Sequence, residues 1–167
     1  MRIWILTLSI LSVLIVSCDK SKISYEVGIS DVLHKTFFKT KKCNSDFYYN
    51  VLIRNDTIFI DGKLRNESGN YKGILNDIES KRLSKLIDNL NPKDRLEKEI
   101  NPTTGMTALT IKKDGKTIDS LVDFKIKWSK NDLKFFKYIG HLICEKELVR
   151  ITDSIIYPTW KMVKPPE

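Results

Sequence analysis

The stretch MTALTIKKDGKTIDSLVDFKIKW, residues 106–128, predicts two antiparallel strands joined by a tight turn. Asp114-Gly115 is the strongest short hairpin signal in the chain, because a type I′ turn requires positive φ angles at both central residues. The second strand alternates apolar and polar residues with the period of a half-buried strand. The expected core side holds Ile118, Ser120, Val122, Phe124, Ile126 and Trp128, and the expected wet side holds Asp119, Asp123, Lys125 and Lys127. In this register Ile111 lies opposite Ile118.

A second hairpin is predicted upstream, with strands at residues 47–54 and 57–60 around Asn55-Asp56, which is also a two-residue turn composition. Pairing across this turn gathers five apolar residues on one face, namely Tyr49, Val51, Ile53, Ile58 and Ile60. The opposite face is expected to be wet apart from the apolar pair Leu52 and Phe59. A third strand is expected at residues 71–75.

Two helices complete the predicted fold. Asn76 and Glu79 have the spacing of a capping box, and apolar residues then recur every three or four positions before Pro92. Ser129 caps a second helix that is expected to extend to about Leu148. The apolar half of this helix consists of Leu133, Phe135, Phe136, Ile139, Gly140, Leu142 and Ile143.

Antiparallel strands with two helices packed on one face make an α+β two-layer sandwich. The antiparallel sheet is expected to consist of the two hairpins. The predicted core includes Val51, Ile53, Ile58, Leu86, Ile111, Val122, Phe124, Phe136 and Ile143.

Residues 1–17 have the organisation of a secretory signal peptide, with a positive Met1-Arg2 start and an apolar run over residues 3–14. The run is short for a membrane span, which needs about 20 apolar residues. Ile15-Val16-Ser17-Cys18 resembles the lipobox of bacterial lipoproteins. The resemblance implies that the Cys18 thiol is acylated and that the mature chain begins at this residue.

The sequence predicts three parts of the chain: a lipoprotein signal peptide at residues 1–17, a tether at residues 18–34 and a single α+β domain at residues 35–167. Smaller expectations are an extended stretch at residues 23–27, a first strand at residues 36–38, a mobile loop at residues 91–103, and a last strand or strap at residues 151–167. We expect the domain to be anchored by lipid in the cell envelope, outside the cytoplasm, at the outer membrane or on the periplasmic face.

Residues 34–150 resemble small uncharacterised α+β domains that bacterial lipoproteins carry. The resemblance rests on Lys42-Cys43-Asn44-Ser45, on residues 49–62, on residues 69–90 and on the alternating strand that ends at Trp128. It implies a cysteine-containing segment followed by a hairpin, a helix, a second hairpin and a terminal helix. It implies no established activity.

The chain is basic, with 29 lysine and arginine residues against 21 aspartate and glutamate residues and a formal charge of +8. Only six of the 29 are arginine, the residue that binds phosphate and bases through a planar fork, so we expect no nucleic-acid partner. The anionic membrane surface, an envelope protein or an acidic polysaccharide suits the charge better. Lys112, Lys113 and Lys116 form the densest local positive cluster.

Cys43 and Cys144 are the thiols that remain if Cys18 is acylated, and an even count in an exported chain allows a disulfide. The alternative is two separated, unreactive thiols. A zinc site is disfavoured because His141 falls on the polar side of its helix and no paired CxxC or HxxxH motif is present. No metal or cofactor is therefore expected.

The sequence offers little material for catalysis, since it has two histidines and no GxSxG turn to hold a nucleophile beside a base. No catalytic residue is therefore nominated. The prediction is a membrane-anchored, non-catalytic envelope lipoprotein that acts as a binding or accessory module. The alternative is an inhibitor or immunity protein directed against an extracytoplasmic enzyme or toxin.

Overall fold

The computed structural model describes residues 24–32, 49–64, 67–97, 106–123 and 126–161. The strands of its main sheet are β1 (Tyr25–Val32), β2 (Tyr49–Arg54), β3 (Thr57–Leu64), β4 (Glu67–Ile74), β6 (Met106–Lys113), β7 (Lys116–Asp123) and β9 (Val149–Ile151). They form one antiparallel sheet in the order β7-β6-β1-β2-β3-β4-β9. The other elements are α2 (Asp77–Asp88), α3 (Lys130–Glu145), the paired short strands β5 (Leu96–Glu97) and β8 (Ile126–Lys127), and the 3-10 turns η1 (Pro92–Asp94) and η2 (Pro158–Lys161).

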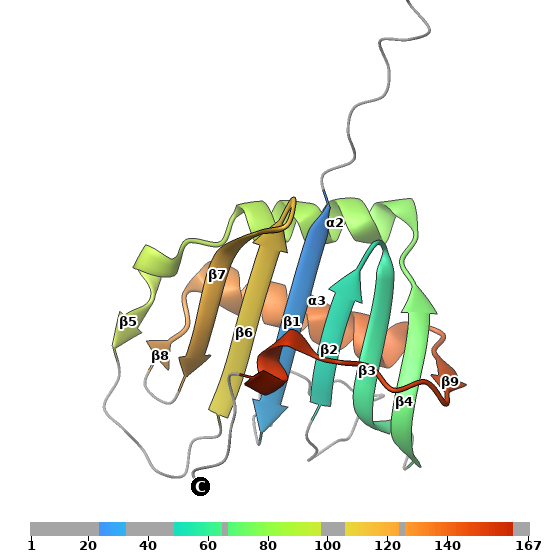
Figure 1. Cartoon of the computed structure of the whole chain (residues 1–167). Helices are drawn as coiled ribbons and strands as arrows, with labels where there is room; N and C mark the ends of the chain where they lie inside the picture. The colour runs from blue at the N-terminus through green and yellow to red at the C-terminus, as the bar shows by residue number, and fades with distance from the viewer. Residues whose placement is uncertain (1–23, 33–48, 65–66, 98–105, 124–125, 162–167) are drawn as a thin grey trace, which may run out of the picture.

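Both helices lie on the same side of the sheet, behind it in the view of Figure 1. The predicted α+β class, with an antiparallel sheet and two helices, is therefore confirmed. The sheet itself is larger than the two predicted hairpins, because seven strands belong to it.

The largest difference from the prediction is β1, which lies inside the segment expected to be a tether through residue 34. β1 pairs with both β2 and β6 in the middle of the sheet, and its Val27 and Ile29 side chains are completely buried. The alternation of these residues with Glu26 and Gly28 is the period of a strand. The strand predicted at residues 36–38 lies outside the described residues.

The hairpin of β2 and β3 has the predicted register, with Ile53 opposite Ile58 and Val51 opposite Ile60. Asn55 and Asp56 have φ angles of 49° and 58°, as a type I′ turn requires. Local turn chemistry therefore sets this part of the sheet.

The register predicted for the second hairpin is wrong. Ile111 lies opposite Asp119, and a bulge beside it makes Ile118 the extra residue of β7. One inserted residue exchanges the two faces of a strand, so Asp119 is buried while Ile118 and Val122 are 47% and 36% exposed. Over residues 118–122, the side of β7 that was predicted to be wet therefore faces the helices, and the side that was predicted to be buried faces away from them.

A buried ion cluster explains why an aspartate occupies the inner face of β7. The Arg95 guanidinium contacts Asp119 Oδ2 at 2.6 Å and Asp132 Oδ1 at 2.7 Å, and the three side chains are at most 7% exposed. It also lies 5.3 Å from the centre of the Trp128 ring. Burial lowers the pKa of Arg95, but the two carboxylates outweigh this effect and raise the pKa above its ordinary value.

The helices begin as predicted, since Asn76 and Ser129 both cap through capping boxes. The predicted core residues found buried are Val51, Ile53, Ile58, Ile111, Phe136 and Ile143. Leu86 is partly buried against this core, whereas Val122 is exposed and Phe124 lies outside the described residues. Leu133, expected on the apolar half of α3, is 47% exposed.

Residues 152–161, which we call the strap, cross the face of the sheet opposite the helices (Figure 1). Thr159 and Ser30 hydroxyl oxygens lie 2.6 Å apart, and the Ser30 hydroxyl donates to Asn50 Oδ1 at 2.6 Å. All three side chains are buried. A Cβ at Gly28 would lie 3.3 Å from Pro158 Cδ, so glycine lets the strap approach the sheet. The region was predicted to be a last strand or a strap over residues 151–167: Ile151 ends β9, residues 152–161 form the strap, and residues 162–167 lie outside the described residues.

Candidate functional site

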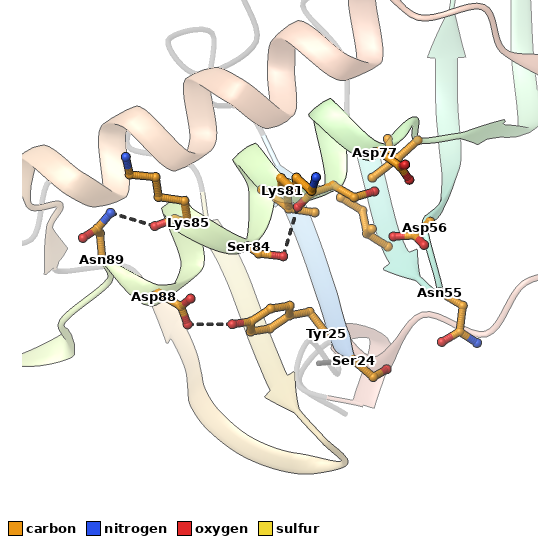
Figure 2. A pocket seen from close by; sticks show the side chains of 14 residues that line it. Ser24, Tyr25, Asn55, Asp56, Asp77, Lys81, Ser84, Lys85, Asp88 and Asn89 are labelled. Carbon is orange, nitrogen blue, oxygen red and sulfur yellow. Dashed lines mark hydrogen bonds between the residues drawn. The ribbon is translucent and has the colours of Figure 1, made fainter. Parts of the chain in front are cut away.

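One hollow among the described residues, which we call the α2 pocket, opens between α2 and the end of the sheet where β1 begins (Figure 2). Its volume is about 790 Å³. Ile53, Leu75 and Leu83 are buried residues among those that line it. The polar lining residues are Ser24, Tyr25, Asn55, Asp56, Asp77, Ser80, Lys81, Ser84, Lys85, Asp88 and Asn89. A partly apolar hollow with polar groups around it is typical of a ligand-binding site.

One buried side-chain polar atom of the α2 pocket lacks a partner among the described residues. The Ser80 Oγ atom is buried and makes no hydrogen bond there, whereas the neighbouring Ser84 hydroxyl donates to the Ser80 carbonyl at 3.0 Å. Since a buried hydroxyl without a partner is destabilising, a polar ligand that reached Ser80 would gain a hydrogen bond.

Tyr25 and Asp88 form the central polar contact of the α2 pocket. The Tyr25 hydroxyl donates to Asp88 Oδ1 at 2.6 Å, and Lys113 Nζ lies 3.1 Å from the same oxygen. Burial and the hydrogen bond to Asp88 raise the pKa of Tyr25. The hydrogen bond from Tyr25, with Lys113 beside it, lowers the pKa of Asp88. Both shifts move away from neutrality, so at neutral pH Tyr25 stays protonated and Asp88 stays charged.

The lowered pKa of Asp88 predicts a pH-dependent contribution to stability. Asp88→Asn keeps an acceptor for Tyr25 but removes the charge. Because the side chain is half exposed, the loss at pH 7 should be below about 1 kcal/mol. The folded pKa lies below the ordinary 3.8, so the difference between the two proteins should disappear as the pH falls through it. Urea unfolding from pH 7 to pH 3 measures this, and a difference that grows toward acid contradicts it.

The second hollow, which we call the strap groove, has a volume of about 810 Å³ and lies on the opposite face of the sheet, beside the strap. Its floor follows a row of directly paired residues that runs across six strands from β4 to β7: Lys72, Phe59, Leu52, Gly28, Thr110 and Ser120. All of these except Gly28 line the groove, together with Glu26, Arg54 and Lys112 from the next row. Ile151 and residues 153–158 form its wall.

An ion cluster lies in the middle of the strap groove. Glu26 Oε2 accepts from Arg54 Nε at 2.6 Å, and Glu26 Oε1 lies 2.9 Å from Lys112 Nζ. Burial raises the pKa of Glu26, but the hydrogen bonds from Lys112 and Arg54 outweigh it, so the pKa is lowered. Glu26 therefore stays charged and holds both cations over the sheet.

The lysine cluster expected at the second hairpin is divided by the fold. Lys112 binds Glu26 in the strap groove, whereas Lys113 binds Asp88 on the side of the helices. Successive residues of a strand point to opposite faces, which explains the separation. The structure thus places the charge in two sites that the sequence pattern did not distinguish.

Of the predicted site residues, Cys144 is described and is disulfide-bonded. Cys18 and Cys43 lie outside the described residues, so the Cys43–Cys144 pairing and the lipidation of Cys18 stay predictions. His141 is exposed, as expected, and stacks on Tyr138 with ring centres 6.2 Å apart. The part of the chain that the structure describes contains no group of three or more residues arranged to hold a metal ion.

Comparison with family models, curated proteins and solved structures found no match to this chain. Among the described residues, no helix has the length and apolar character needed to cross a membrane. The sequence prediction missed both Glu26 and Lys72 as site residues. The alternation around Glu26 was a usable signal, but the position of Lys72 depends on strand order, which spacing does not reveal.

Proposed function

We propose that this protein is a membrane-anchored, non-catalytic lipoprotein of the cell envelope and acts there as a binding module. The observation that carries the proposal is the α2 pocket, an open hollow whose central pair, Tyr25 and Asp88, has pKa values shifted away from neutrality. Such groups donate and accept hydrogen bonds in constant charge states, which suits recognition.

The position of the α2 pocket supports action close to a membrane. Ser24 lines the pocket and lies six residues after Cys18. Six residues span at most about 20 Å when fully extended. With the acyl chains on Cys18 in the bilayer, the pocket would therefore open within that distance of the membrane surface.

A second candidate function is an inhibitor or immunity protein that binds an extracytoplasmic enzyme or toxin. The strap groove favours this alternative because it crosses six strands and is long enough for a polypeptide segment. The two functions differ in the identity of the partner and share the requirement for binding.

Binding to an envelope macromolecule is tested with the full-length, lipid-bearing protein immobilised and exposed to envelope extract. We expect retained species at low salt and fewer at high salt, because contacts of exposed lysines are screened beyond about 8 Å at physiological ionic strength. A parallel column without protein is the control. Hydrolysis of an envelope substrate by the same preparation, with nothing retained, would show that the protein is an enzyme.

A further inference from the structure

The strap groove has the dimensions of a site for an extended chain. Its floor runs from Lys72 on β4 to Ser120 on β7, across five gaps between strands. Neighbouring strands lie about 4.8 Å apart, so the row is about 24 Å long, which equals about seven residues of extended polypeptide. Its three middle residues, Leu52, Gly28 and Thr110, are already buried, so an incoming chain can contact the residues at its two ends and the exposed side chains beside it. The strap bounds one side of the groove from the β4 end as far as β1 and β6 (Figure 1).

The lining of the strap groove carries three cations, Arg54, Lys72 and Lys112, and two carboxylates, Glu26 and the exposed Asp153, which gives it a net charge of +1. The Glu26 side chain is 16% exposed, whereas the Arg54 and Lys112 side chains that bind it are 51% and 37% exposed. Lys72 is also exposed at the β4 end and has no ion-pair partner among the described residues. An incoming chain therefore meets two cations held in place by Glu26 and a third that is available for pairing.

Apolar side chains in the same groove distinguish a polypeptide from a polysaccharide. Ile156 of the strap is 76% exposed, and Phe59 on the floor is partly exposed. Both line the groove. A polypeptide can supply aliphatic side chains to cover both residues between its acidic residues, whereas an acidic polysaccharide offers only the C–H faces of its sugar rings.

We propose that the strap groove binds an extended acidic polypeptide segment of a partner protein, with carboxylates on Lys72, Arg54 and Lys112 and apolar side chains against Phe59 and Ile156. This assignment rests on the proposed function of the protein as a binding module and specifies the partner's chemistry. Electrostatic complementarity of this kind gives specificity and fast association.

The test uses the full-length, lipid-bearing protein in detergent micelles and a fluorescent eight-residue peptide of two Glu-Glu-Leu-Leu repeats, which places both residue types on each face of an extended chain. Fluorescence anisotropy should show saturable binding that weakens with salt. The double variant Lys72→Glu, Ile156→Asp should bind at least tenfold more weakly. Lys134→Glu, an exposed substitution on α3 behind the sheet, is the matched control and should bind as the wild type does.

Thermal unfolding of each variant shows that it is folded. A peptide of two Lys-Lys-Leu-Leu repeats should not bind. The inference is overturned if the acidic peptide does not bind, if the double variant binds it unchanged, or if an oligogalacturonate of equal charge competes as well as the peptide does. Retention of envelope species that survives the double variant would reject the groove and leave the proposed function standing. If the wild-type protein retains no envelope species, the proposed function itself is rejected.

Discussion

Arg95→Ala should lower the free energy of unfolding by about 3 to 5 kcal/mol. The substitution leaves Asp119 and Asp132 charged and buried with no cation beside them, which costs far more than the loss of an exposed pair. Asp132 also caps α3 through the Ser129 amide at 2.9 Å, so the disturbance reaches a helix end. Urea unfolding followed by circular dichroism measures the loss.

Arg54→Ala is the matched control for that experiment, because Arg54 also binds a carboxylate but is half exposed. Its expected cost is below about 1 kcal/mol. Equal losses for the two variants would mean that the Arg95 cluster is not buried as described.

Cys18→Ala should abolish acylation and, with it, the membrane anchoring that the acyl chains supply. If the proposed lipidation is correct, the variant loses every acyl chain, and each buried CH₂ contributes about 0.8 kcal/mol to membrane binding. Metabolic labelling with a tagged palmitate, followed by separation of membrane and soluble fractions, measures both effects. Ser21→Ala is the control and should keep the label. Label that persists in Cys18→Ala would refute the lipobox prediction.

The sequence predicted those elements whose determinants are local. Asn55-Asp56 requires only its own backbone conformation to turn the chain, and Asn76 with Glu79 closes a helix end within four residues. Such features follow from the chemistry of neighbouring residues and need no knowledge of the tertiary structure.

The register of β7 could not be predicted because its determinant is distant. Asp119 lies on the inner face because it binds Arg95, which lies 24 residues earlier in the chain. The bulge at Ile118 allows β7 to turn Asp119 toward that face. A strand that alternates apolar and charged residues is read with the apolar side inward unless a buried partner for the charge is known.

β1 was mistaken for a tether because its second face binds the strap through small and polar residues. Glu26, Gly28 and Ser30 resemble a solvated linker when the strap is not known. The strap groove was missed because its floor is a row of residues that crosses several strands. The order of those strands cannot be read from the spacing of residues in the sequence.

The position of β1 has a mechanical consequence for a protein held by its N-terminus. Tension on the proposed anchor at Cys18 would enter the domain at Tyr25 and act along the axis of an interior strand, β1. β1 has six paired positions with β2 and eight with β6, and its hydrogen bonds lie perpendicular to that axis. A pull in this direction loads both ladders in shear at once and does not open one hydrogen bond after another.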